Sequence, residues 1–152
     1  MNKITSRPYT SSDLSACLAI FDSNVPTFFA PEEREEFREH LGNVDATTAP
    51  YIVLVLDNAV IACGGLTIDE TQRKASLSWS IVDRNLHGQR LGTLLTQARL
   101  TVARSTPGLS EVELSTSQHT RGFYEGFGFS VSKVTPSGFG PGLDRWDMAM
   151  RL

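Results

Sequence analysis

The sequence has little of what marks several protein classes. It contains only two cysteines, Cys17 and Cys63, in 152 residues; this excludes a disulfide-rich scaffold, and their spacing does not fit a metal site. It has no apolar run near the roughly 20 residues of a transmembrane helix, and no charged start followed by an apolar segment. We therefore expect a soluble, cytoplasmic protein without a bound metal, in which both cysteines are small buried hydrophobic residues.

Positive charge is also scarce. The chain has 14 Lys and Arg against 17 Asp and Glu, for a formal net charge of -3, whereas nucleic-acid-binding proteins usually carry a basic face. The composition thus predicts neither a nucleic-acid nor a membrane partner. The length is typical of one domain and the hydrophobic content of 40% is ample for one core, so we predict a single domain over residues 1–152.

The first third of the chain predicts two helices. Apolar residues recur at helical spacing over 14–21, with Ser11 or Ser12 as the N-cap. A second helix is expected over 31–41, with acidic residues in its first turn and Gly42 just past its end. Its apolar face is thin, so it lies on the surface or forms a wall of a cleft. Its glutamates would attract a cationic ligand if they faced that cleft and would otherwise face water.

The rest of the chain predicts a sheet with further helices. Two β-branched runs flank Asp57-Asn58, which is a hairpin signal, and 74–82 continues the antiparallel meander. A helix follows from Leu91, where Leu94, Leu95, Ala98 and Val102 recur at helical spacing. After it we expect a strand over 110–117, a short helix over 120–128 and a final strand pair over 129–135 and 144–152.

One junction between a strand and a helix suggests an anion site. Residues 85–95 read NLHGQRLGTLL, and the first turn of a helix offers unpaired N–H groups and the positive end of the helix dipole. A pyrophosphate would fit there. The three glycines of a dinucleotide fingerprint and the Gly-Lys-Ser/Thr of a nucleotide-triphosphate loop are both missing. A phosphate-binding protein of another kind stays open on this feature alone.

Two motifs together resemble the GNAT acetyltransferase superfamily. The family signature Gln/Arg-x-x-Gly-x-Gly/Ala, at the start of a helix, corresponds to HGQRLG at 87–92. A second signature, Asn-x-x-Ala-x-x-aromatic-Tyr-x-x-x-Gly-Phe, corresponds to SQHTRGFYEGFGF at 117–129, with Tyr124 in register. The motifs occur in the family's order. The resemblance implies an α/β (α+β) fold, with a mixed, mostly antiparallel central sheet of six to seven strands flanked by about four helices.

The resemblance also implies an activity and a site. Such enzymes move an acetyl group from acetyl-CoA, used as a co-substrate without a metal, to a primary amine of a small molecule or peptide by direct attack in a ternary complex. Tyr124 matches the family's general acid, which protonates the leaving thiolate. The residues expected to bind the cofactor are Ser80, Ile81, Val82, His87, Gly88, Gln89, Arg90, Leu91, Gly92, Thr93, Ser117 and Phe123.

The chain departs from the family pattern at several positions. His87 stands in place of Gln or Arg, and Arg90, which either reaches a phosphate or faces solvent, stands in place of the central glycine. Ser117 and Thr120 replace the usual Asn and Ala. Ser76 occupies the position that often holds a glutamate base, and an ordinary hydroxyl cannot serve as that base.

The identity of the base is therefore left open by the sequence. His119, Glu113 and Asp83 are the nearby titratable groups, and a water path to solvent is an alternative to all three. A second functional class also stays open, in which the domain is a catalytically weak sensor or regulatory module that binds acyl-CoA.

The acceptor side is expected to form from loops. Asn24, Phe28 and Phe29 lie in the linker between the first two helices, and the phenylalanines form either an apolar lid or a core plug. Phe139 lies in the Gly- and Pro-rich segment 136–146, which either folds over the acceptor or is a plain hairpin turn. A strand exposed at the end of the sheet leaves a homodimer open.

Overall fold

The computed structural model describes residues 3–152 and contains one seven-stranded sheet. Its strands are β1 (Thr5–Pro8), β2 (Tyr51–Leu56), β3 (Ala59–Asp69), β4 (Lys74–Val82), β5 (Glu111–Thr116), β6 (Ser130–Gly140) and β7 (Leu143–Arg151). The helices are α1 (Leu14–Ser23), α2 (Glu33–Gly42), α3 (Leu91–Arg104) and α4 (Arg121–Glu125), with short 3-10 turns η1 (Ser11–Asp13) and η2 (Arg84–Leu86). The strand order is β1-β2-β3-β4-β5-β7-β6, and every pair is antiparallel except β4 with β5. The predicted mixed, mostly antiparallel sheet with about four helices is confirmed.

The meander of β2, β3 and β4 begins with the predicted hairpin. Asp57 and Asn58 both have positive φ, at 51° and 65°, which is the backbone geometry of the two-residue turn that matches the twist of paired strands. Asn and Asp tolerate this left-handed conformation better than most residues. The local sequence thus fixes the turn between β2 and β3, and their register shifts once beyond it, between Leu54 and Val55.

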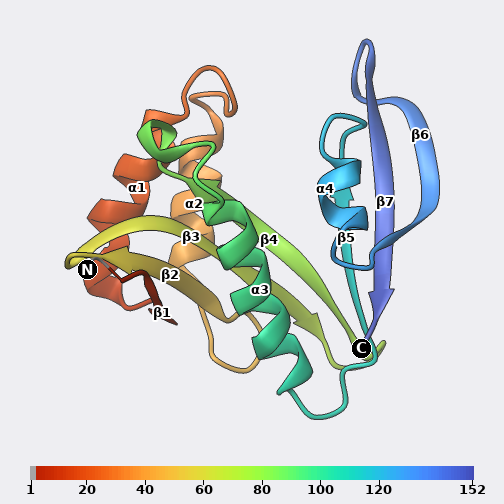
Figure 1. Ribbon diagram of the computed structural model, residues 1–152, viewed down its shortest axis with the longest axis horizontal. Coiled ribbons are helices and arrows are strands. Elements are labelled where there is room, and N and C mark those ends of the chain that lie inside the picture. The colour runs from red at the N-terminus through yellow and green to blue at the C-terminus, as the bar shows by residue number, and fades with distance from the viewer. Residues whose placement is uncertain (1–2) are drawn as a thin grey trace.

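The sheet separates two layers of helices (Figure 1). Val53, Cys63 and Ile81 pack with α1 and α2 on one face, whereas their neighbours Leu54 and Ala62 pack with α3 on the other face. This alternation follows from the two-residue period of a strand. Both cysteines are free and buried, as predicted.

The buried face of α3 differs from the predicted one. Leu91, Leu95 and Leu100 are buried, but Leu94 is 39% exposed, so the prediction that Leu94 belongs to the core face was wrong. Two polar residues, Thr96 and Arg99, are buried instead. A helical face assigned from apolar residues alone leaves out Thr96 and Arg99, so the predicted buried face of α3 is rotated from the real one.

The C-terminal half forms a second cluster around a hairpin. Leu114, Phe129 and Met148 are buried there, together with the end of α3. The strands β6 and β7 extend well into the segment 136–146, which was expected to be a loop, and only a short turn joins them. That segment is therefore a long hairpin, and its side chain Phe139 is 46% exposed.

The strand β1 was not predicted, because it is short, polar and at the edge of the sheet. It is fastened to the start of α1 by Asp13, whose carboxylate accepts hydrogen bonds from the Arg7 guanidinium at 2.8 and 2.9 Å and from the Thr10 amide at 2.9 Å. Thr10, and not Ser11 or Ser12, is the residue that begins this turn. The Arg7 guanidinium, aided by the Thr10 amide, lowers the pKa of Asp13 from 3.8 to about 2 despite its burial.

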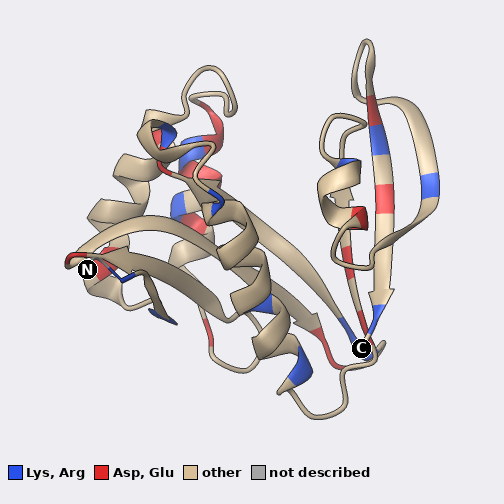
Figure 2. Cartoon of the chain, in the orientation of Figure 1, with Lys and Arg blue, Asp and Glu red and all other residues tan. Residues whose placement is uncertain are grey.

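Charged residues are scattered over both halves of the chain. Figure 2 shows Lys and Arg interspersed with Asp and Glu along the helices and strands. Among residues 3–152, none of the helices has the length and apolar character needed to cross a membrane.

Replacing Asp13 with Asn is expected to lower the free energy of unfolding by about 2 kcal/mol at pH 7. Because the pKa of Asp13 is lowered in the folded state, its contribution is complete above pH 4 and is lost as the pH falls through about 2. Urea unfolding at pH 7 and pH 2.5 measures the change. The matched control is Asp22→Asn, which breaks the exposed Asp22–Arg34 pair and should change stability little. An equal effect of Asp13→Asn at both pH values would contradict the assignment.

Candidate active site

A pocket forms where β4 and β5 separate. The two strands pair over only three positions, from Lys74↔Glu111 to Ser76↔Glu113. Beyond Ser76 no ladder joins them, and they diverge from the end of the sheet nearest the C-terminus (Figure 1). The rest of the β4 edge therefore faces an opening and not a partner strand, so its backbone can meet a ligand.

A β-bulge in β4 lies beside this opening. The register of β4 against β3 shifts by one residue within 78–81, and Trp79 takes the unusual φ of 42°. The hydroxyl of Tyr51 donates a 2.6 Å hydrogen bond to the Trp79 carbonyl. A bulge bends a strand and increases its local twist. This contact from the buried side of β2 therefore holds β4 in the bent shape that leaves β5.

The loop after β4 leads into a helix start with free amides. Gly88 and Arg90 have φ of 84° and 62°, and the first bond of α3 runs from the Leu94 amide to the Arg90 carbonyl at 3.2 Å. None of the six amides of 88–93 donates a hydrogen bond within the described chain. Free amides at the positive end of a 14-residue helix are groups of the kind that can bind an anion.

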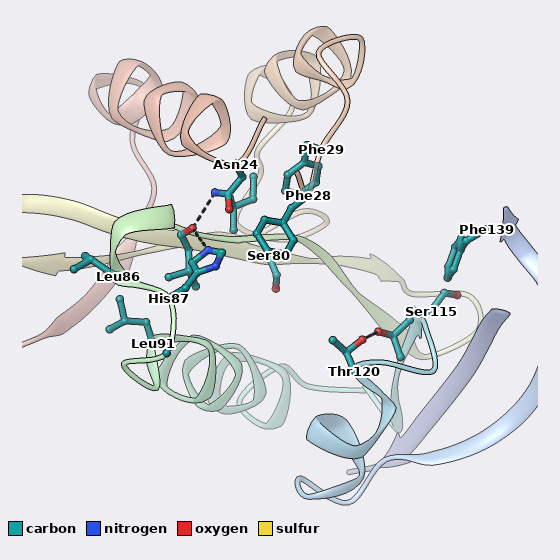
Figure 3. Close-up of a pocket in the computed structure, with 14 residues that line it drawn as sticks. Asn24, Phe28, Phe29, Ser80, Leu86, His87, Leu91, Ser115, Thr120 and Phe139 are labelled. Atoms are coloured by element: carbon teal, nitrogen blue, oxygen red, sulfur yellow. Dashed lines mark hydrogen bonds between the residues drawn. The ribbon is translucent and has the colours of Figure 1, made fainter. Parts of the chain in front are cut away.

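The end of β4 is tied to both flanking segments. The Val82 carbonyl accepts a 2.9 Å hydrogen bond from Asn24 Nδ2 and lies 2.9 Å from His87 Nε2 (Figure 3). Asn24 is buried and also donates to Ile20 of α1. Since the Asp83 amide bonds to β3 at Ile61, the Val82 N–H and C=O point toward the opening by strand alternation. The carbonyl is thus occupied, and the amide is the group left for a ligand.

The pocket at this opening has a volume of about 750 Å³. It brings together all four of the predicted acceptor residues and six of the predicted cofactor residues. The lining comprises Asn24, Phe28, Phe29, Ser80, Ile81, Val82, Leu86, His87, Gly88, Leu91, Ser115, Thr116, Thr120 and Phe139. Gln89, Arg90, Gly92, Thr93, Ser117, Phe123 and Tyr124 do not line it.

The two phenylalanines of the α1–α2 linker differ in position: one packs into the core and the other lies exposed at the pocket. Phe29 packs against Phe21 and Trp79, with ring centroids 5.0 and 6.2 Å apart, and plugs the core. Phe28 is 57% exposed and lies over the loop after β4, with its ring 4.9 Å from the Arg84 guanidinium carbon and 5.2 Å from the His87 ring. Phe28 therefore covers the pocket as a lid residue.

The helix α4 stands on the other side of the opening. Tyr124 is half-buried and packs against Phe123 and Phe129, with ring centroids 5.1 and 5.9 Å apart. The Phe123 ring lies close to the first turn of α3. A Cβ atom placed on Gly92 would be in van der Waals contact with that ring, at 3.7 Å. This contact sets the short helix of Tyr124 beside the row of free amides.

Sequence reasoning missed a buried cation in α3. Arg99 is 1% exposed, and its Nε and Nη1 atoms have no hydrogen-bond partner. Burial lowers the pKa of Arg99, and the phenols of Tyr124 and Tyr51 act in the opposite direction. Its Nη2 atom donates a 3.5 Å hydrogen bond to the Thr96 hydroxyl. The one signal in the sequence is spacing, because Arg99 follows the buried residues Leu91 and Leu95 at intervals of four.

The titratable groups near the pocket are distributed unevenly. His119 is exposed, and Asp83 accepts a 2.9 Å hydrogen bond from the Asn85 amide, which caps the turn η2. Glu113 lies at the base of the opening, opposite Ser76. The glutamates of α2 do not line the pocket. Among residues 3–152, no three His, Cys, Asp or Glu side chains gather as metal ligands would.

Replacing Arg90 with Gly is expected to raise the free energy of unfolding by up to about 1 kcal/mol, because the left-handed backbone strains every residue that has a Cβ. Arg90→Ala is the matched control, since it removes the same cation and keeps the strain. Urea unfolding of the three proteins measures the effect. A Gly variant no more stable than the Ala variant would show that φ at this position is not strained.

Comparisons with known proteins agree with this architecture. Residues 17–129 match the model of the Acetyltransferase (GNAT) family. A Desulfovibrio desulfuricans protein of the GNAT family is 21% identical, with a TM-score of 0.83 over 98% of this chain and 99% of that chain. An aminoglycoside 6'-N-acetyltransferase complexed with coenzyme A is 14% identical, with a TM-score of 0.79 over 97% and 96% of the two chains.

A third solved structure, the yncA protein of Salmonella typhimurium with its cofactor acetyl-CoA, is 18% identical, with a TM-score of 0.80 over 99% of this chain and 94% of that chain. No curated protein sequence matches the chain significantly. The structural neighbours share the fold, while the family model spans most of the chain, including both motifs and the diverging strands. The chain therefore belongs to the GNAT family of acetyltransferases.

Proposed function

We propose that this protein transfers an acetyl group from acetyl-CoA to a primary amine of a small molecule or peptide, by direct attack in a ternary complex. The observation that carries the proposal is the row of six free amides at 88–93, which opens beside the pocket between β4 and β5. Free amides at a helix start suit a pyrophosphate. The pocket of about 750 Å³ beside them is the space proposed for the rest of the cofactor and the acceptor.

The cofactor would lie along the unpaired edge of β4. Its diphosphate meets the amides of 88–93, and its pantetheine amides meet the strand near Ser80, Ile81 and Val82. At Val82 only the N–H is open, because the carbonyl already has two partners. Ser117, just before α4, and Phe123 of α4 do not line the pocket and would contact the cofactor beyond its edge. The proposal requires the sulfur to come near Tyr124, which is half-buried on α4 and does not itself line the pocket.

The reaction needs no covalent enzyme intermediate. The neutral amine attacks the thioester carbonyl, a C–N bond forms, the C–S bond breaks, and the thiolate of coenzyme A takes a proton. A backbone N–H of β4 stabilises the oxyanion as it develops. We assign the proton donation to Tyr124, which stands on α4 across the opening from β4.

The acceptor would enter under the lid residue. Asn24, Phe28 and Phe29 form one side of the pocket and Phe139 of the β6–β7 hairpin forms the other. Three of these four side chains are aromatic. They favour an acceptor that presents its amine on an apolar or flat body.

A second function is favoured by Ser76, which stands in place of the family's glutamate base. The domain would then bind acyl-CoA as a sensor without turnover. Release of free thiol separates the two functions when the protein is given acetyl-CoA and a panel of ethanolamine, lysine, spermidine, an aminoglycoside and a peptide with a free N-terminus. We expect at least one amine to raise the rate. Measurable acetyl-CoA binding without amine-dependent release would identify the sensor.

Tyr124→Phe is expected to lower kcat by about 10²- to 10⁴-fold, since it removes the acid but keeps the ring. The affinity for acetyl-CoA, measured by calorimetry, should change little. Tyr9→Phe removes a phenol hydroxyl far from this pocket and is the matched control, with kcat unchanged. Equal turnover of Tyr124→Phe and the parent protein would remove Tyr124 from the acid role.

A further inference from the structure

The last pair of residues before β4 and β5 diverge joins a serine to a glutamate. Ser76 and Glu113 are register partners, and Ser76 Oγ donates a 3.4 Å hydrogen bond to Glu113 Oε1. Resting on the function proposed above, we propose that Glu113 is the base that takes the proton from the acceptor ammonium. The carboxylate that the family often carries on the fourth strand would thus be carried on the neighbouring strand.

Glu113 lies on the face of the sheet opposite α3 and α4. Val112 and Leu114, its neighbours along β5, are buried in the cluster with α3, so Glu113 and Ser115 point to the other face. Its side chain is 44% exposed. With the cofactor thiol directed from the α4 side, an acceptor that reaches Glu113 approaches the thioester from the opposite side.

A second pocket, of about 600 Å³, gives access to this carboxylate. Its walls come from β4, β5, β6 and β7, and they include Ser76, Glu113, Ser115, Lys133, Arg145 and Asp147. Ser115 lines both this pocket and the larger one. The two pockets therefore adjoin at Ser115, two residues beyond the last rung, and the proposal places the acceptor amine there, between Glu113 and the cofactor.

The other carboxylates nearby are less suited to proton transfer. Asp147 accepts hydrogen bonds from Ser115 Oγ at 2.6 Å and Arg145 Nε at 2.9 Å, which hold its pKa below the usual range. Glu111 lies 3.5 Å from Lys74 and does not line the pocket. Glu113 has only the long bond to Ser76 and a 3.8 Å contact with Lys74.

The charges facing Glu113 are therefore Lys74 from β4, Arg145 and Asp147 from β7 and Lys133 from β6, with Glu111 on its own strand. In the step itself, an N–H bond of the ammonium breaks, its proton passes to a Glu113 oxygen, and the freed electron pair of nitrogen attacks the thioester. The proton later leaves to solvent through the exposed pocket.

The test uses the amine from the panel that the parent protein acetylates fastest. Glu113→Gln is expected to lower kcat by about 10²- to 10⁴-fold at pH 7. The deficit should shrink steadily as the pH approaches about 10, the ordinary pKa of an alkylamine, because the amine then arrives neutral. Acetyl-CoA affinity and the unfolding temperature should match those of the parent protein.

Glu111→Gln is the matched control, since it removes a carboxylate of the same strand that also contacts Lys74, and its kcat should equal that of the parent protein. Adding Ser76→Glu to Glu113→Gln restores a carboxylate on β4 and should recover at least about tenfold of the lost rate at pH 7. Recovery supports the proposal. A double variant that binds acetyl-CoA normally but recovers nothing counts against it.

Two other results would overturn the assignment. One is a Glu113→Gln variant with the parent kcat across the pH range, and the other is a deficit that stays constant with pH. Both leave acetyl transfer by the parent protein intact and refute only the role of Glu113. A parent protein that releases no thiol with any amine refutes the proposed function itself.

Discussion

The hydrogen bond from the Tyr51 hydroxyl to the Trp79 carbonyl is the constraint on which the site depends. A flat β4 would continue its ladder with β5 past Ser76, and the pocket would close into an ordinary sheet. The bulge prevents this by turning the strand away, but it places Trp79 in a backbone conformation that a bulky residue rarely adopts. A buried donor fixed on β2 offsets that strain, because the Tyr51 ring is packed by α1 and α2. The core beneath α1 and α2 thus keeps β4 bent and the opening between β4 and β5 in place.

The Val82 carbonyl is a second point where two parts of the site meet. Asn24 reaches it from the end of α1 and His87 from the loop before α3, while Phe28 lies over His87. The linker that walls one side of the pocket and the loop that carries the free amides are therefore held by one backbone atom. Because Asn24 is buried and bonds α1 at the same time, the geometry of the anion-binding loop is set from the first helix. The two halves of a ternary complex would then be built around a common anchor.

Local chemistry made much of the fold predictable, and long-range contacts account for most of the errors. The Asp57-Asn58 turn, the helix start after β4 and the short helix before Gly128 all follow from residues adjacent in sequence. The strand β1 was not predicted because it has no apolar period; it is a short exposed edge strand paired with β2 and tied to the start of α1 by Arg7 and Asp13. The face of α3 was misplaced because Arg99 is buried, a situation that composition alone argues against. The sequence predicted the linker residues that line the pocket and, from the first motif, His87, Gly88 and Leu91. It did not predict which of Phe28 and Phe29 is exposed, because that depends on how the linker folds back.

Two departures from the family pattern, at Arg90 and Ser76, have a structural explanation in the backbone conformation and in the pairing of the strands. The glycine of the signature is replaced by Arg90, yet the backbone there keeps the left-handed conformation that glycine would adopt freely, so the loop shape survives and its amides stay unbonded. In the same way, the glutamate missing at Ser76 has a counterpart one strand away, because a parallel rung places Glu113 beside it at nearly the same height in the sheet. A residue search along one strand cannot find this substitution, since the two positions are 37 residues apart in the chain. Under the role proposed for Glu113, the carboxylate keeps its height in the sheet and is supplied by β5 in place of β4.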